Sequence, residues 1–260
     1  MSWWGRVVGG TFGFMLGGPL GALMGASLGN YFDSGLNNLD QSNGLSRGEP
    51  ERVQLAFFTT TFALIGYVAK ADGHVTRDEI SLAERVMDQM RLSSQQRKAA
   101  IDLFHLGKAD KFEADEVIAQ FRMEVGRRRN LVRMLVNILS STAYADGNFD
   151  PRELSRLEEI CALLGVSKGE LKELLEQIAA QSGFDSPENS KGKLNAAFAL
   201  LGLPPSAHFP EVKRAYRRMM NQNHPDKLVA KGLPEEMIEL ATAKTRDIKA
   251  AYELIKAQGK

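Results

Sequence analysis

Asn221-Gln222-Asn223-His224-Pro225-Asp226-Lys227 is the stretch that decides the fold of the C-terminal part of the chain, because it interrupts one helical pattern and precedes another. Pro225 cannot continue a helix and disfavours helical geometry at the residue before it. We therefore expect His224 and Asp226 to lie at an exposed turn between two helices.

The residues before this stretch predict an amphipathic helix over about 209–222. Its apolar residues follow the i, i+3, i+4, i+7 spacing of one helix face; they are Val212, Ala215, Tyr216 and Met219. The opposite face is basic and consists of Lys213, Arg214, Arg217 and Arg218. On its own, such a face is usually just a solvated surface.

The residues after the stretch predict a second helix. It is expected to begin near Pro234, with Glu235 and Glu236 in its first turn, where proline and acidic residues are favoured. Its apolar positions recur at alternating spacings of three and four, at Ile238, Ala241, Thr245, Ile248, Tyr252 and Ile255. Two such stripes predict an antiparallel helical hairpin.

On these residues, the segment 194–260 resembles a J domain, the part of DnaJ-type co-chaperones that activates DnaK-type heat-shock chaperones. The matching segments are 197–202, 212–217, 224–227 and 248–254. The segment departs from the family pattern in two ways: no short fourth helix follows the outgoing helix, and the usual basic motif late in that helix is altered.

The resemblance implies a division of roles in binding the chaperone. His224, Pro225 and Asp226 would touch its ATPase domain and linker, and the basic helix face would meet an acidic patch. We include Lys227 among the chaperone-binding residues. This division is physically reasonable, since charge steers the encounter while a fixed turn supplies specificity.

Composition narrows the function further. The 260 residues include 33 Lys and Arg against 32 Asp and Glu, a net charge of +1, so nothing global indicates a nucleic-acid partner. The single cysteine, Cys161, excludes an intramolecular disulfide and lies among apolar residues, which predicts a buried thiol. No nucleophile–base pair, phosphate-binding loop or metal-ligand cluster stands out, so we expect no enzyme and no cofactor.

The N-terminal segment carries no charge between Arg6 and Asp33. As a helix it would be roughly 39 Å long, enough to cross a bilayer. Glycine recurs at every fourth position, at Gly5, Gly9, Gly13, Gly17, Gly21, Gly25 and Gly29. In a membrane helix this pattern allows close helix–helix approach. We predict a transmembrane helix over 7–32 that forms a homodimer through Gly9, Gly13, Gly17, Gly21 and Gly25.

Two alternatives compete with the membrane anchor. A cleaved signal peptide would carry Arg6 before an apolar run, but no clean Ala-x-Ala site follows and an exported J domain would miss its partner. A flexible glycine-rich lead would not keep strict spacing. Flanking charges do not decide the orientation. The J domain decides it, because it must face the cytoplasm to meet its partner, which leaves the short segment 1–6 outside.

The middle of the chain, 51–182, lies between predicted linkers at 33–50 and 183–193. It is expected to be all-helical and internally duplicated, because 69–80 matches 143–154 position by position. The match continues in register where Ser93 and Gln96 correspond to Ser167 and Glu170. Each repeat then reads as helix, Asp-Gly turn, helix, short turn, helix.

The Asp-Gly turns allow two interpretations. Their Gly-to-Glu separation fits a calcium loop, but the positions that normally supply the first carboxylates are apolar, basic or uncharged. Helix caps explain the pattern better: Thr76 with Glu79 and Asp150 with Glu153 resemble capping boxes. The segment also resembles the TerB-like helical domain, whose acidic cluster is sometimes suspected of binding metal. The candidate positions that carry over are Asp72, Glu79, Asp146 and Glu153.

The order of parts resembles the DjlA family of inner-membrane DnaJ-like co-chaperones. The expected fold is all-α, with a single N-terminal transmembrane helix, a duplicated TerB-like helical bundle and a C-terminal J domain. The resemblance implies a homodimeric regulator of a DnaK-type chaperone, in some bacteria linked to capsular polysaccharide signalling. The alternative is a membrane scaffold or sensor whose TerB-like domain binds a metal or ligand and whose J domain only docks the chaperone.

Overall fold

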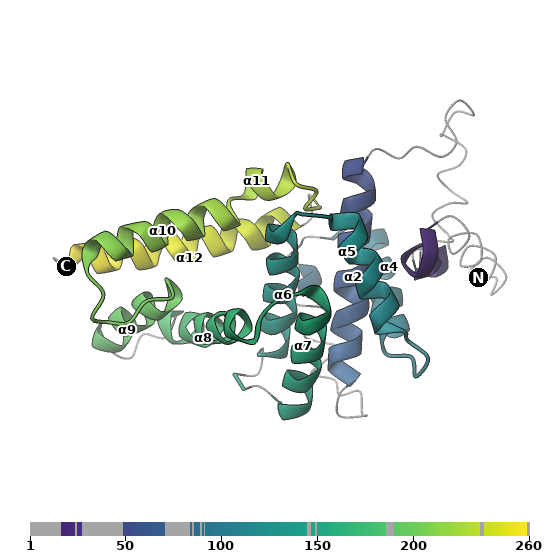
Figure 1. Cartoon of the computed structure of the whole chain (residues 1–260), viewed down its shortest axis with the longest axis horizontal. Helices are drawn as coiled ribbons and strands as arrows, with labels where there is room; N and C mark the ends of the chain where they lie inside the picture. The colour runs from purple at the N-terminus through teal and green to yellow at the C-terminus, as the bar shows by residue number, and fades with distance from the viewer. Residues whose placement is uncertain are drawn as a thin grey trace. The chain divides into compact units, whose positions relative to one another are not determined.

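The computed structural model describes residues 17–23, 25–27, 49–70, 84, 86–88, 90, 92–144, 147–148, 150–185, 190–234 and 237–258. Across these ranges the regular structure is helical, as the sequence predicted (Figure 1). The longer helices are α2 (Glu49–Ala69), α4 (Ser94–Gly107), α5 (Ala114–Val125), α6 (Arg129–Ala143), α7 (Pro151–Leu164), α8 (Lys168–Asp185), α9 (Ser190–Leu200), α10 (Phe209–Asn223), α11 (Pro225–Val229) and α12 (Ile238–Ala257).

The chain divides into two compact units, residues 1–128 and 129–260. The boundary falls between the two predicted repeats, so the first unit holds α2, α4 and α5. The second repeat, α6 to α8, shares its unit with the J segment, α9 to α12. Each unit has its own buried core.

The first unit is built on α2, an apolar helix whose inner residues are almost fully enclosed. Phe57, Phe62 and Leu64 are each 0% exposed, and the Phe57 ring meets the Phe121 ring of α5 at 6.0 Å between centroids. Residues 52–69 of this helix are long and apolar enough to cross a membrane, but 72% of them are buried inside the protein. Their burial against α4 and α5 makes α2 a core helix.

α2 and α4 cross at unusually close range through a pair of glycines. A Cβ added at Gly66 would lie 2.1 Å from the Phe104 carbonyl oxygen, and one added at Gly107 would lie 1.8 Å from the Ala63 carbonyl oxygen. Real Cβ atoms essentially never come within 3.0 Å of another heavy atom in this way. Only glycine at both positions allows the two backbones to approach so closely.

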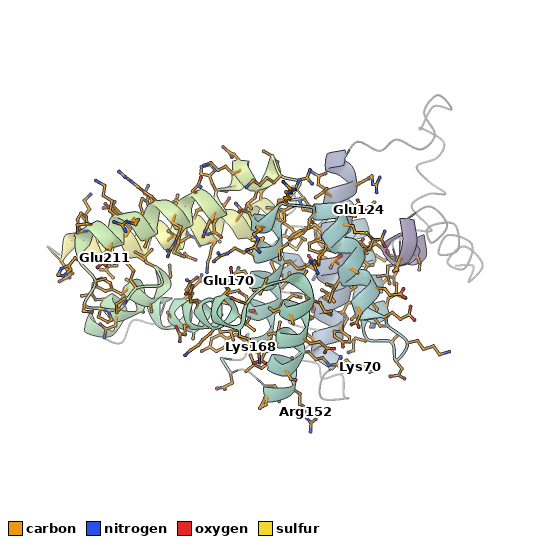
Figure 2. The ribbon with its side chains drawn as sticks, in the orientation of Figure 1. Lys70, Glu124, Arg152, Lys168, Glu170 and Glu211 are labelled. Atoms are coloured by element: carbon orange, nitrogen blue, oxygen red, sulfur yellow. The ribbon has the colours of Figure 1, made fainter. Side chains whose placement is uncertain are left out.

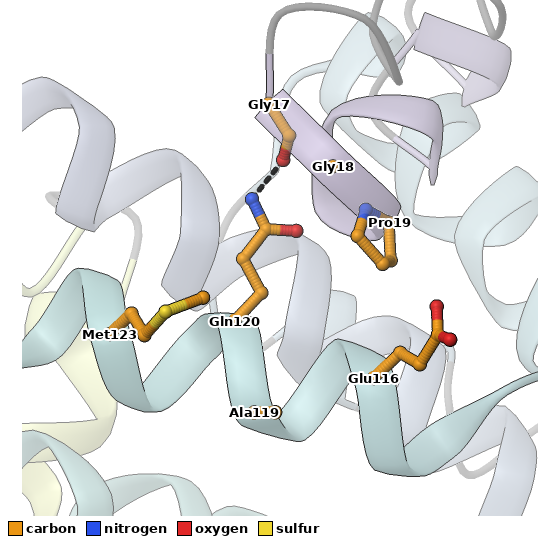
Figure 3. A pocket seen from close by; sticks show the side chains of 7 residues that line it. All are labelled: Gly17, Gly18, Pro19, Glu116, Ala119, Gln120 and Met123. Atoms are coloured by element: carbon orange, nitrogen blue, oxygen red, sulfur yellow. Dashed lines mark hydrogen bonds between the residues drawn. The ribbon is translucent and has the colours of Figure 1, made fainter.

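Part of the N-terminal segment lies against α5. Residues 17–23 and 25–27 are helical. Gln120 of α5 accepts a hydrogen bond of 2.7 Å from the Leu20 amide. It also donates one to the Gly17 carbonyl (Figure 3). A helix inside a bilayer cannot keep this contact, so the α5 position and the membrane position of this segment are alternatives. The rest of the predicted span lies outside the described residues.

The helix caps of the two repeats correspond, which supports the internal duplication. Ser93 and Gln96 exchange hydrogen bonds at the start of α4. Ser167 and Glu170 do the same at the start of α8. Ser140 and Gln181 stand at the positions in the second repeat that correspond to Gly66 and Gly107. The close crossing of the first repeat is therefore not available to the second.

The C-terminal helices form the predicted hairpin, with α10 and α12 lying side by side (Figure 1). Their inner faces are buried together with α9; the central residues are Val212, Ala215, Met219, Ile248, Ala251 and Ile255. Tyr216 and Tyr252 stack with ring centroids 4.3 Å apart. α12 begins at Ile238, later than the sequence suggested, because the Met237 amide bonds the Pro234 carbonyl at 3.0 Å and closes a turn first.

Candidate functional site

The basic face of α10 is open to solvent. Lys213, Arg214, Arg217 and Arg218 are all exposed, whereas Val212, Ala215 and Met219 on the inner face are buried. No ion pair joins these four cations to an acid among the described residues. Figure 2 shows the side chains that project from α10, with Glu211 labelled near its start. Four uncompensated positive charges on one helix face form a surface that attracts acidic partners.

The tripeptide is held between two helices. His224 has extended backbone angles, φ −61° and ψ 125°, and is both the C-cap of α10 and the N-cap of α11. Pro225 is the first residue of α11, where its lack of an amide donor costs nothing. The short helix α11 was not predicted; it fixes the turn because the Leu228 amide bonds the His224 carbonyl at 3.1 Å.

The side chains of the tripeptide are accessible to different degrees. The Asp226 side chain is 90% exposed and that of His224 is 43% exposed. His224 Nδ1 lies 4.0 Å from Asp226 Oδ2, too far for a hydrogen bond, and has no partner among the described residues. Lys227 is exposed and donates to the Asn221 side chain. The tripeptide thus presents the Asp226 carboxylate and part of the His224 ring to solvent, while His224 Nδ1 is itself buried.

Among the described residues, three side-chain hydrogen bonds at two places join the J segment to the second repeat. Asn130 in α6 donates a hydrogen bond of 3.2 Å to the Gln222 carbonyl near the end of α10. Gln181 in α8 donates to Asp247 of α12 and accepts from Lys244 at 3.5 Å. No local motif marks these residues, since their partners are more than 60 positions away in the sequence.

The acidic turns are only partly described. Asp72, Glu79 and Asp146 lie outside the described residues, and Glu153 is in the first turn of α7. Asp150 caps α7 as predicted, because its carboxylate accepts the amides of Arg152 at 2.7 Å and Glu153 at 3.4 Å. Gly147 has φ +90°, a left-handed conformation that glycine adopts without strain. In the part of the chain that the structure describes, no group of three or more metal-binding side chains is present.

Cys161 is buried, as predicted, inside α7. Burial, with smaller contributions from Glu158 and Glu170, raises the pKa of its thiol to about 12. A thiol with so high a pKa is protonated at neutral pH and is a poor nucleophile.

The predicted dimer face is described only in part. Gly17, Gly21 and Gly25 lie within the described helical residues, whereas Gly9 and Gly13 do not. A Cβ added at Gly17 would meet nothing within 4 Å. An open pocket runs between Gly17–Pro19 and the α5 side chains Glu116, Gln120 and Met123 (Figure 3). Met123 is 75% exposed.

Three family models match successive parts of the chain. The co-chaperone DjlA transmembrane domain matches residues 1–41, the tellurite resistance protein TerB matches 59–176, and the DnaJ domain matches 196–260. These matches follow the order of parts predicted from the sequence.

Curated relatives extend over most of the chain. The co-chaperone protein DjlA of Shewanella oneidensis is 42% identical over 212 residues, 81% of each chain. That of Photobacterium profundum is 38% identical over 272 residues, 98% of each chain. That of Coxiella burnetii is 38% identical over 222 residues, 83% of this chain and 82% of the relative. No solved structure matches significantly.

Proposed function

The chain belongs to the DjlA family of membrane-anchored, DnaJ-like co-chaperones, and on that premise we propose that it stimulates the ATPase of a DnaK-type chaperone at the cytoplasmic face of the inner membrane. The observation that carries the proposal is the J segment: an exposed basic helix leads directly into His224, Pro225 and Asp226. Its curated relatives are co-chaperones, a regulatory role rather than a catalytic one.

An ATPase assay tests this proposal directly. The purified full chain, reconstituted in lipid nanodiscs, is added to a DnaK-type chaperone in single-turnover conditions. Acceleration of ATP hydrolysis is the expected result. Binding without acceleration would instead favour the alternative, a scaffold or sensor whose J domain only docks the chaperone.

The topology follows from the partner's location. The J segment must meet a cytoplasmic chaperone, so we place both helical units in the cytoplasm and the first few residues outside, with one span between them. A role in capsular polysaccharide signalling rests on the family resemblance alone; capsule output after deletion of the gene tests it.

The basic face of α10 is expected to act mainly on the rate of encounter. In the variant Arg214→Glu/Arg218→Glu, the association rate with the chaperone should fall roughly tenfold at low salt, because exposed charges steer association. The wild-type rate should fall as salt rises, since the screening length is only about 8 Å at 0.15 M. Stopped-flow mixing with labelled chaperone measures both.

The matched control is Lys249→Glu/Lys256→Glu, which makes the same charge change at exposed positions of α12. We expect this control to lose less than the α10 variant. A salt-independent wild-type rate, or equal losses in the two variants, would contradict a steering role for α10.

We propose that the membrane helices dimerise through the middle of the glycine stripe, Gly13, Gly17 and Gly21. Spacing four drifts by about 40° per step on an ideal helix, so only a few steps can face one partner. Gly17→Leu/Gly21→Leu should keep the protein in the membrane, because it adds apolar surface, yet reduce crosslinked dimer, because close backbone approach is blocked. Crosslinking of the full chain in membranes measures this.

Ala22→Leu/Ala26→Leu is the control for that experiment, since it adds two leucines at the same spacing off the glycine stripe. This variant should dimerise like the wild type. If the glycine variant also dimerises normally, the dimer contact lies elsewhere in the chain.

A further inference from the structure

The first turn of α6 borders the tripeptide although it belongs to the second repeat. Asn130 donates its hydrogen bond to the carbonyl of Gln222, only two residues before His224. α6 and α10 pack against each other within one compact unit (Figure 1). The surface around the tripeptide therefore continues beyond the J segment.

A second contact keeps this arrangement fixed. Lys244 of α12 is only 7% exposed, and burial lowers its pKa although Asp247 opposes the effect. Its ammonium group and the Asp247 carboxylate share the Gln181 side chain of α8. Separating α8 from α12 would break these partly buried hydrogen bonds and leave the buried Lys244 without them, which is costly. The J segment is thus held on the repeat at both α10 and α12.

The bordering surface is positively charged. Arg129 and Arg133 flank Asn130 on α6, are both exposed, and lie one turn apart, about 6 Å along the axis. Neither forms an ion pair with a described residue. They contribute weakly to the lowered pKa of Glu170, which is held down mainly by a hydrogen bond from the Ser167 backbone amide. The Glu170 carboxylate thus caps the start of α8 and forms no ion pair with either arginine.

A protein–protein interface of ordinary size is wide enough to include the start of α6. A stable protein–protein interface covers about 800 Å² on each partner, a patch about 30 Å across. From the contacts above, Arg133 lies within about 20 Å of His224. A partner that covers the tripeptide and the end of α10 therefore extends to the first turn of α6.

We propose that Arg129 and Arg133 extend the chaperone-docking surface onto the TerB-like domain, where they meet acidic side chains of the chaperone's ATPase domain beyond those that face α10. Asn130 is the positioning residue that keeps this surface beside the tripeptide. The inference rests on the proposed function, since it names a further part of the same docking site. It gives the second repeat a direct role in partner selection.

The test measures chaperone association with the full chain in nanodiscs at low and high salt. Arg129→Glu and Arg133→Glu should each slow association, and the double variant should slow it roughly three- to tenfold at low salt, with the loss shrinking as salt rises. Arg152→Glu is the matched control: it makes the same charge change at the start of α7, and Figure 2 shows its side chain far from α10 within this unit.

The outcomes separate the inference from the function it rests on. If the wild type does not bind the chaperone, the proposed function fails and the inference with it. If the wild type binds but the α6 variants behave like Arg152→Glu, the inference alone is overturned. Arg129→Gln/Arg133→Gln guards against misfolding, because it removes charge without reversing it and should give about half the effect on the logarithm of the rate.

Discussion

His224→Gln or Asp226→Asn is expected to abolish stimulation of the chaperone's ATPase while the protein stays folded. Neither side chain is bonded into the fold: the Asp226 side chain is 90% exposed, and the half-exposed His224 has a buried Nδ1 with no hydrogen-bond partner among the described residues. Exposed substitutions of this kind change the free energy of unfolding by about 0.5 kcal/mol or less. Loss of a central interface residue costs about 2 kcal/mol or more, which is roughly 30-fold in affinity.

A second histidine variant is the matched control in the same assay. His208→Gln makes the identical change at the exposed N-cap of α10, about 24 Å away at the other end of the helix. It should leave stimulation unchanged. Full stimulation by His224→Gln or Asp226→Asn would remove the tripeptide from the mechanism, whereas loss in His208→Gln as well would indicate a general effect on α10.

The hairpin was predictable because its signals are local. The spacing of Val212, Ala215 and Met219 marks one face of α10, and the structure buries that face. Capping residues also act within one turn, so Asp150 and Ser167 could be assigned from sequence alone. Since these caps recur at matching positions, the amino-acid sequence also indicates the register of the two repeats.

The contacts between elements were not predictable. Asn130 and Gln222 are 92 residues apart, and nothing in either local sequence indicates a partner. α11 was missed because Pro225 breaks the incoming helix, and the same residue also suits the first position of a new one. The sequence therefore predicted the helical hairpin of the J segment and its interruption at Pro225, but not the surface of the second repeat beside them.

Replacing either glycine at the crossing of α2 and α4 is expected to cause a large loss of stability. Gly66→Ala or Gly107→Ala adds one methyl group that would lie 2.1 Å or 1.8 Å from a backbone oxygen of the other helix. A backbone atom cannot rotate away as a side chain can, so the helices must separate by about 1 Å or more and lose packing along their length. We expect the free energy of unfolding of the first unit to fall by about 3 kcal/mol, at the upper end for an overpacked core.

For a unit of this size such a loss lowers the melting temperature by about 15 °C. Hydrogen exchange of the α2 and α4 amides in the full chain measures it locally. Gly169→Ala in α8 is the control, because its added methyl group would meet only the Ser167 hydroxyl at 4.0 Å. Helix propensity then predicts that stability holds or rises by up to about 1 kcal/mol. Equal behaviour of Gly66→Ala and Gly169→Ala would show that α2 and α4 can move apart freely, and that glycine at the crossing is not required for the fold.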